Sequence, residues 1–515
     1  MRNAVFRSWS MSGPNYSSDV APYLRLSASQ CYKEFLMRIV IAGAGMAGLS
    51  TALALGRSGH DVTLLERNCI FRESTWEECL RGPREGIAHF FQPHAFWPRG
   101  RLLLKNAFPD VYQALLDAGA CELHLNRKIR GEAQPGDEDL IYLGVRRPLI
   151  EWALLRAVLR EPRIAVRGGV RVMGTLGRQG AVPVVTGLRT SEGDVQADLV
   201  IDALGRTSPA SSWLQALGAT APRTESSPCG LVYYSRYFQL KPGAAMPMQD
   251  YLISPRGDLG YGGFITFLGD NRTFAIVLSI PTSDADLKIL QHEPAFMAAC
   301  RQIPVTAGLA DPAFAEPISR VLPMGGLLNT LCHYIGDEGP VAFGFLPIGD
   351  SLCHTNPAYA LGLTFSLIHA LELCEALRKV PADDPRSQAM EYFARITPEM
   401  NERYWLGCAL DAARTRMWQG QRLDFTRRDG CHPLFLFAGA AAVALDDGEV
   451  CRKTLRRMGV LDRLSTFDDD IVLQQRVEEL LARKFAEGPP PRPGPPRAEL
   501  IRAVRGSMGQ TGGTL

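Results

Sequence analysis

The sequence predicts an α/β fold built on a buried parallel sheet, and three short segments predict it. Residues 37–42 (MRIVIA), 61–65 (DVTLL) and 198–203 (DLVIDA) are apolar, rich in β-branched residues and bounded by glycine or polar residues. Such runs are typical of strands that are covered on both faces. Residues 46–55, between the first two runs, are good helix formers, so residues 37–65 form one β–α–β unit of about thirty residues.

A glycine motif links the first predicted strand to this helix. Gly43, Gly45 and Gly48 form G-x-G-x-x-G, in which the glycines allow a tight turn, close approach of a pyrophosphate and close helix–strand packing. The helix N-terminus offers free N–H groups to phosphate, and the acid at the end of the second strand is placed to bind a ribose hydroxyl. The motif predicts a Rossmann-like dinucleotide site and leaves NAD and FAD both open. The residues assigned to it are Gly43, Gly45, Met46, Ala47, Gly48, Glu66 and Arg67.

A second segment, some 300 residues later, favours FAD. Residues 346–350 (LPIGD) end a predicted strand at Asp350, and residues 356–362 (NPAYALG) lead into a predicted helix at 362–377. A carboxylate at a strand end can accept hydrogen bonds from the ribityl hydroxyls of a flavin. The following helix N-terminus would face the pyrimidine edge, where negative charge collects on reduction. The alternative is an ordinary strand–turn–helix in which Asp350 is a helix cap.

With these motifs the chain resembles the FAD-dependent monooxygenases of the aromatic-hydroxylase superfamily. Within that group it is most similar to the flavin epoxidases that act on polyketide chains in polyether biosynthesis. The resemblance covers residues 37–420 and rests on IAGAGMAGLSTALAL with LLER, RRPLIEWALL, ADLVIDALGRTSP with WLQALG, and LPIGDSLCHTNPAYALGLTF. These motifs are specific for flavin binding and much less specific for the substrate.

The resemblance implies further cofactor-binding residues. Arg147 falls where the family has an arginine that reaches the cofactor, although a surface arginine on a helix is the alternative. The chain departs from the family at Ala360, where glycine is usual, and at Leu361, where a polar residue is common. The other residues implied to lie near the cofactor are Asp202, Gly205, Gly349, Asp350, Pro357 and Gly362.

Candidate substrate residues come from two segments. Arg84, Glu85 and His89 lie in RGPREGIAHFF, which resembles a family segment near the flavin; His89 is either a contact of cofactor or substrate or a structural histidine. The aromatic residues of the β-rich stretch either line an apolar pocket or form plain sheet core, and they are Tyr233, Tyr234, Tyr237, Phe264 and Phe267. Cys353 and His354 are adjacent on a loop, so their side chains should point apart, and thiol catalysis is not expected.

The resemblance implies a monooxygenase that transfers one oxygen atom from O2 to its substrate through a flavin hydroperoxide. The substrate would be apolar and polyketide-like, and the reaction would be an epoxidation or a hydroxylation. The flavin carries the chemistry, so no catalytic side chain is assigned. With no second G-x-G-x-x-G seen for a nicotinamide domain, NAD(P)H would act by transient docking or through a partner flavin reductase. The alternatives are a flavin reductase or dehydrogenase, a flavin halogenase, for which the Trp-x-Trp-x-Ile-Pro segment is missing, and a non-catalytic flavin-binding protein.

Composition excludes several other classes. With 46% hydrophobic and 21% charged residues and a net charge of +2, the chain is expected to be globular, cytoplasmic and without affinity for nucleic acid. Its 12 cysteines are scattered without a Cys-x-x-Cys pair, so we expect reduced thiols and no metal site. The apolar run 433–445 is too short to span a bilayer, which takes about twenty residues, and should be a buried helix.

The sequence divides into five regions. Residues 1–36 are an N-terminal extension expected to be disordered, although their Arg and Ser content also fits a transit peptide. Residues 37–225 and 321–380 form a discontinuous FAD-binding domain, which a β-sheet substrate domain at 226–320 interrupts. Residues 381–487 form a helical C-terminal region. Residues 488–515 begin with GPPPRPGPPR and should be a proline-rich disordered tail.

Overall fold

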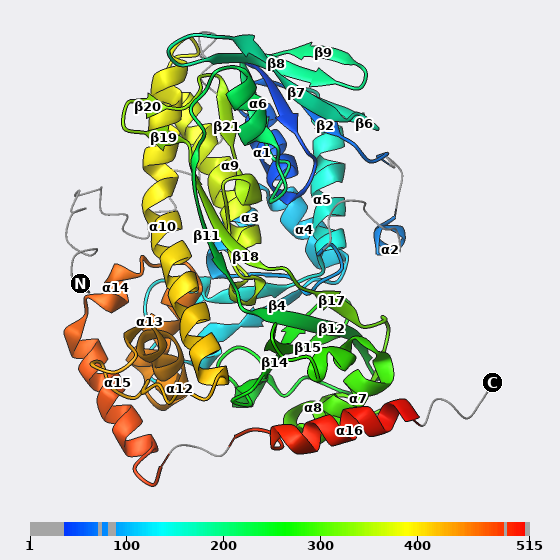
Figure 1. Cartoon of the computed structure of the whole chain (residues 1–515), viewed down its shortest axis with the longest axis vertical. Helices are drawn as coiled ribbons and strands as arrows, with labels where there is room; N and C mark the ends of the chain where they lie inside the picture. Colours follow the sequence, from blue (N-terminus) through cyan, green and yellow to red (C-terminus); the bar gives the residue numbers. More distant parts are fainter. Residues whose placement is uncertain (1–35, 71–74, 81–88, 489–491, 510–515) are drawn as a thin grey trace.

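A computed structural model describes residues 36–70, 75–80, 89–488 and 492–509. The predicted N-terminal extension, Arg84, Glu85 and residues 510–515 lie outside the described residues. The structure is a mixed α/β fold with a parallel sheet, antiparallel β-rich regions and C-terminal helices, as the sequence predicts (Figure 1).

The parallel sheet has five strands in the order β21-β10-β1-β2-β6. These are β1 (Arg38–Ala42), β2 (Asp61–Glu66), β6 (Ile164–Gly168), β10 (Leu199–Asp202) and β21 (Phe345–Pro347). Helix α1 (Met46–Arg57) packs between α5 (Arg147–Arg160) and α9 (Gly362–Lys379). Because the strands are buried, they read in sequence as unbroken apolar runs. The strand β21, from a segment far along the chain, is thereby brought beside β10.

Two small antiparallel sheets complete this part of the molecule. One contains β7 (Val172–Arg178), β8 (Val184–Thr190) and β9 (Gly193–Gln196), and the other contains β3 (Ala95–Phe96), β5 (Ile141–Gly144) and β4 (Cys121–His124). Gly169, with φ +79°, turns the chain between β6 and β7. Helices α3 (Pro98–Ala107), α4 (Pro109–Asp117) and α6 (Ala210–Ala216) lie in the same part.

The β-rich stretch forms an antiparallel sheet in the order β13-β14-β15-β12-β16, with β17 also paired to β12. The strands are β12 (Leu231–Leu240), β13 (Arg256–Asp258), β14 (Gly263–Leu268), β15 (Thr273–Pro281), β16 (Ala315–Pro317) and β17 (Leu322–Met324). Helices α7 (Glu293–Gln302) and α8 (Pro304–Leu309) follow. A three-stranded sheet of β11 (Arg223–Pro228), β18 (Leu328–His333) and β22 (Cys353–His354) runs between this sheet and the parallel one (Figure 1).

The C-terminal region is helical. Helix α10 (Pro385–Trp418) runs along the molecule, and α13 (Gly448–Met458), α14 (Ser465–Asp468) and α15 (Ile471–Lys484) gather at its C-terminal end (Figure 1). The expected helix at 433–445 is divided into four short pieces. They are α11 (His432–Leu434), a π-helical turn at Phe435–Gly439, α12 (Ala440–Val443) and a 3₁₀ turn at Ala444–Asp446. Its apolar residues are nevertheless buried, as expected.

The expectation of a disordered tail is wrong for residues 497–509. Helix α16 (Arg497–Gly509) packs on α7, and Leu500 and Val504 are buried in the core of the substrate sheet. Arg497 also pairs with Asp284 at 2.8 Å. The proline run indicates that the folded part of the chain ends before it. Leu500 and Val504, however, are spaced to share one face of a helix, and this apolar face packs on α7. Among the described helices, none is both long and apolar enough to cross a membrane.

Candidate functional site

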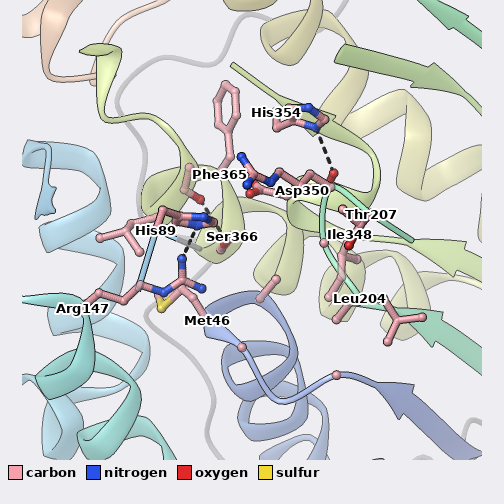
Figure 2. A pocket seen from close by; sticks show the side chains of 18 of the residues that line it. Met46, His89, Arg147, Leu204, Thr207, Ile348, Asp350, His354, Phe365 and Ser366 are labelled. Atoms are coloured by element: carbon pink, nitrogen blue, oxygen red, sulfur yellow. Dashed lines mark hydrogen bonds between the residues drawn. The ribbon is translucent and has the colours of Figure 1, made fainter. Parts of the chain in front are cut away.

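One cavity of about 900 Å³ brings the two predicted flavin segments together. Its walls come from the turn after β1, the end of β2, the turn after β10, the start of α5 and residues 348–366. This volume lies near the upper limit of small-molecule sites, which is about 1,000 Å³. Figure 2 shows Arg147 and His89 reaching in from one side and Asp350 and His354 from the other. The predicted residues that line it are Gly43, Gly45, Met46, Ala47, Glu66, Arg67, His89, Arg147, Gly205, Asp350, Pro357 and Gly362.

The glycine turn is shaped by close packing on one side and is open on the other. Gly43 has φ +100°, and a Cβ there would lie 2.6 Å from the carbonyl oxygen of Ala203. A Cβ at Gly48 would lie 1.8 Å from the carbonyl oxygen of Gly43, so the helix and the turn touch there. At Gly45 the nearest atom to an added Cβ is a guanidinium nitrogen of Arg147, 3.7 Å away. Gly43 and Gly45 both line the cavity, and at Gly45 there is room for a group to approach the backbone.

The N-terminus of α1 points the positive end of a helix dipole at the same space. Gly45 is its N-cap residue, the first turn contains no acid, and among the described side chains none caps this helix end. The first N–H groups of a helix have no partner within the helix. Together with the partial positive charge of the helix end, they suit a phosphate.

Glu66 holds the glycine turn against the end of β2. One carboxylate oxygen accepts a hydrogen bond from the backbone N–H of Ala44 (3.0 Å), and the other accepts from the backbone and side chain of Asn68 (2.9 and 2.8 Å). Glu66 is buried at the cavity wall, and the exposed Arg67 follows it. The structure thus places the predicted acid beside the glycine turn and also gives it a structural role.

Asp202 and Gly349 support the cavity from behind and do not line it. The buried Asp202 carboxylate accepts from the backbone N–H of Leu204 (2.9 Å) and from the hydroxyls of Ser208 (2.6 Å) and Ser351 (3.2 Å). Burial raises its pKa, and these hydrogen bonds oppose the rise. The Ser351 hydroxyl also accepts from the backbone N–H of Gly205 (2.8 Å), so the turns after β10 and β21 are tied to each other.

Asp350 stands at the cavity edge between β21 and α9. The backbone N–H of the preceding residue, Gly349, donates to Nδ1 of the buried His369 (3.0 Å), which fixes this short turn. A Cβ added to Gly362, the first residue of α9, would lie 3.7 Å from Oδ1 of Asp350. The carboxylate and the helix N-terminus are therefore neighbours on one wall, as the sequence predicts. Ala360, two residues before α9, has φ +50°, a left-handed conformation that favours glycine.

Arg147 lies in the cavity wall and not on the surface. It donates through Nε to Glu151 (2.8 Å) and through a terminal nitrogen to Nε2 of His89 (2.5 Å). Burial and, next, the arginine charge lower the pKa of His89 to about 2, so the imidazole is neutral. Since Nε2 accepts, the proton is on Nδ1. That atom is buried, and among the described residues it has no hydrogen-bond partner.

Sequence reasoning missed a second neutral histidine. His94 lines the cavity, and its Nδ1 bonds to the carbonyl oxygen of Gln92 (2.7 Å). Burial, and then the charge of Arg147, lower the pKa of His94 to about 3. Burial also lowers the pKa of His354, whose Nδ1 bonds to the carbonyl oxygen of Asp350 (3.3 Å). His94 lies three residues beyond the segment RGPREGIAHFF that resembles the family, so no sequence signal indicated its position.

The loop after β22 is held by a buried network that sequence reasoning also missed. Asn356 donates to Asp411 of α10 (2.8 Å) and accepts from the hydroxyl of Tyr233 (2.6 Å). Asp411 further accepts from Asn329 (2.8 Å) and Tyr359 (2.7 Å), and it pairs with Arg414. Helix α10 and the substrate sheet thereby position the loop that carries Pro357 and Ala360.

The predicted substrate aromatics do not line this cavity. Phe264 is buried in the sheet core with Phe274 and Phe296, and Phe267 packs near Tyr233 in a separate cluster. Tyr233 donates from its hydroxyl to Asn356, a residue of the cavity wall. Phe264 is therefore part of the sheet core and does not line the cavity. Cys353 is buried, and burial raises its thiol pKa, which argues against thiol catalysis. The described residues contain no cluster of three or more His, Cys, Asp or Glu side chains placed to hold a metal.

Comparison with known proteins gives the same assignment of fold. Residues 38–80 match the family model described as FAD dependent oxidoreductase. Protein Rv3254 of Mycobacterium tuberculosis is 26% identical over 381 residues, which is 66% of this chain and 72% of that protein.

Solved structures extend the likeness over most of the chain. PqsL, a probable FAD-dependent monooxygenase from Pseudomonas aeruginosa, superposes with a TM-score of 0.53 at 16% identity, covering 75% of this chain and 98% of PqsL. The flavin-dependent brominase Bmp2 superposes with a TM-score of 0.58 at 16% identity, covering 87% and 99%. The chain therefore has the fold of these flavin-dependent enzymes, and its residues 38–80 are similar to the family described as FAD dependent oxidoreductase.

Proposed function

We propose that this protein is an FAD-dependent monooxygenase that transfers one oxygen atom from O2 to a small, largely apolar substrate. The observation that carries the proposal is the meeting of two distant segments around one cavity: the uncapped N-terminus of α1 at Gly45 and the carboxylate of Asp350. The fold shared with PqsL supports the same reaction class.

The residues present fit the FAD that this fold implies. The space in front of Gly45 and the helix end behind it suit the diphosphate. Glu66 lies where an acid can accept from a ribose hydroxyl, and Asp350 where one can accept from the ribityl chain. Arg147 adds a positive charge at the wall, and the Nδ1–H of His89, which has no partner among the described residues, supplies a buried donor. Bound FAD would supply the activation of O2.

The side chains favour epoxidation over phenol hydroxylation. A phenol hydroxylase gains from a general base with a pKa near the working pH. His89 and His94 are neutral, but with pKa values of about 2 and 3 they are weak bases. An alkene needs no base for epoxidation, so a polyketide-like alkene is the substrate that this site suits. NAD(P)H would reduce the flavin by docking transiently or through a reductase.

Oxygen labelling tests the proposal. The purified protein is supplied with FAD, NAD(P)H, a flavin reductase and a panel of apolar alkenes under ¹⁸O2, and products are analysed by mass spectrometry. We expect FAD binding and one ¹⁸O atom per product. Product formation without label would indicate a reductase or dehydrogenase, and failure to bind FAD would refute the whole proposal.

Halogenation is the second candidate. The observation that favours it is the superposition with the brominase Bmp2, which covers 87% of this chain and 99% of Bmp2. The same assay is therefore run with bromide and an electron-rich aromatic acceptor. Brominated product in place of oxygenated product would replace the leading proposal.

A further inference from the structure

A second cleft lies behind the loop that borders the large cavity. It has a volume of about 50 Å³ and is bounded by Trp97, by Leu361 and by Phe437 of the C-terminal region. Leu361 also lines the large cavity, so the two spaces share a wall. A water molecule needs about 10–15 Å³ on such a scale, so the cleft holds a small polar head group and not a whole substrate.

Three arginines line this otherwise apolar cleft, and two of them have carboxylate partners. Arg403 bonds to Glu399 at 3.2 Å, and Arg457 bonds to Asp468 at 3.0 Å. Both are thereby neutralised within the protein. They have structural roles between α10, α13 and α14.

The third arginine, Arg256 of β13, has no such partner. Within the part of the chain that the structure describes, no carboxylate lies within 4.0 Å of its guanidinium, and its polar contacts are two long ones of 3.4 Å to the carbonyl oxygen and hydroxyl of Ser254. The side chain is exposed, and it lines the cleft. Protein nevertheless packs around it closely enough that burial lowers its pKa.

The neighbouring Tyr142 does not neutralise this charge. Burial raises the pKa of its phenol, which is therefore neutral. A guanidinium cannot lose its proton in a protein, so Arg256 offers a permanent cation at the edge of an apolar cleft. A planar, bidentate anion is the ligand that a guanidinium fits best.

We propose that Arg256 binds the carboxylate of an apolar organic anion in this cleft, and that this anion is the substrate, a second step that rests on the proposed function. The apolar wall contacts the first carbons of the anion. The rest of the molecule extends beyond the cleft, along the loop whose other face borders the large cavity. The substrate class is thus narrowed from apolar molecules in general to apolar monocarboxylates.

Calorimetry on the full-length protein tests the binding step, with decanoate as the probe and decanamide as its neutral isostere. Wild type should bind decanoate at least about tenfold more tightly than decanamide, because the charge-assisted bond is lost in the amide. Arg256→Met should remove this preference, whereas Arg256→Lys should keep part of it. The matched control is Arg178→Met, which removes an exposed arginine of β7 and should change nothing.

Thermal unfolding of the same variants separates a ligand site from a structural role. Because Arg256 has no ion pair among the described residues, Arg256→Met should melt at the temperature of wild type or above it. The inference is overturned if wild type does not bind decanoate in the millimolar range, if it binds both probes equally, if Arg256→Met binds decanoate like wild type, or if that variant melts clearly earlier.

A separate measurement tests whether the bound anion is the substrate. Decanoate should perturb the absorption spectrum of bound FAD in wild type and not in Arg256→Met. An Arg256-dependent binding site without any flavin response would make the anion an effector and overturn the substrate assignment. If the protein bound decanoate through Arg256 but no FAD, the proposed function would fail and the carboxylate site would stand.

Discussion

Arg147 donates a hydrogen bond of 2.5 Å to Nε2 of His89, which lies 58 residues earlier in the chain (Figure 2). The contact places a permanent cation beside an imidazole inside the cavity. It selects the tautomer that carries its proton on Nδ1, and it keeps the ring neutral at physiological pH.

His89 should therefore not titrate in the range where histidine ordinarily does. With a pKa of about 2, it should stay neutral from pH 5 to pH 8. Arg147→Met should raise this pKa, because the second-largest cause of the depression is then removed, while burial remains. NMR of ring-labelled histidine, assigned with His89→Gln, measures both. A His89 resonance that titrates near pH 6.5 in wild type would contradict the assigned contact.

Gly45 and Gly48 should respond differently to alanine. Gly45→Ala meets no atom closer than 3.7 Å and has an ordinary φ of −77°, so the protein should fold normally. Its methyl group would occupy the proposed phosphate position and weaken FAD binding by about tenfold to a hundredfold. Gly48→Ala clashes with backbone at 1.8 Å and should lower the free energy of unfolding by about 1–3 kcal/mol or more. FAD fluorescence titration and thermal melts distinguish the two; equal melts would refute this division of roles.

Buried histidines should make the fold acid-sensitive. Burial lowers the pKa of His60 and of His369 to about 4. Their unfolded pKa is about 6.5, so the unfolded chain binds more protons as pH falls below that value, and stability is lost between pH 6.5 and about 4. At pH 5 each group contributes a loss of about 2 kcal/mol. Melts from pH 8 to 4 should show this decline, and His60→Leu should make it shallower. His292→Gln, at an exposed position, is the control.

Replacing Asp411 should lower the free energy of unfolding more than removing a single hydroxyl from the network around it. Asp411→Asn leaves the cation of Arg414 without its partner and should cost about 3–5 kcal/mol. Tyr233→Phe removes one hydrogen bond to Asn356 and should cost about 1 kcal/mol. Chemical denaturation measures both, with Tyr251→Phe as the matched control. If Asp411→Asn were no more costly than Tyr233→Phe, the carboxylate would not be the centre of the network.

Replacing Ala360 with glycine should stabilise the fold. Its φ of +50° carries a penalty of about 1–2 kcal/mol for a residue with a Cβ, while glycine costs about 0.5–1 kcal/mol in the unfolded chain. Ala360→Gly should thus raise the free energy of unfolding by up to about 1 kcal/mol. Ala358→Gly, two residues earlier at an ordinary φ, should lower it. The prediction is contradicted if both substitutions shift the unfolding midpoint in the same direction.

Much of the parallel domain was predictable because its signals are local. The strands β1, β2 and β10, the helix α1 and the glycine turn follow from short apolar runs and glycine spacing. The tail helix α16 was not predicted, since a proline run precedes it and its partner α7 lies almost 200 residues earlier. The substrate aromatics were uncertain for a related reason: strand residues alternate in direction, and only the pairing of strands shows which face is core.

The sequence by itself predicted the fold class, the glycine turn after β1 and the strand end at Asp350, because each signal depends on residues a few positions apart. The tertiary structure alone decided what surrounds the charge of Arg256. Arg403 has Glu399 one helical turn away and Arg457 pairs with Asp468 eleven residues later, whereas among the described residues no carboxylate pairs with Arg256. The physical reason is that the walls around Arg256 come from distant segments of the chain, which no local period encodes.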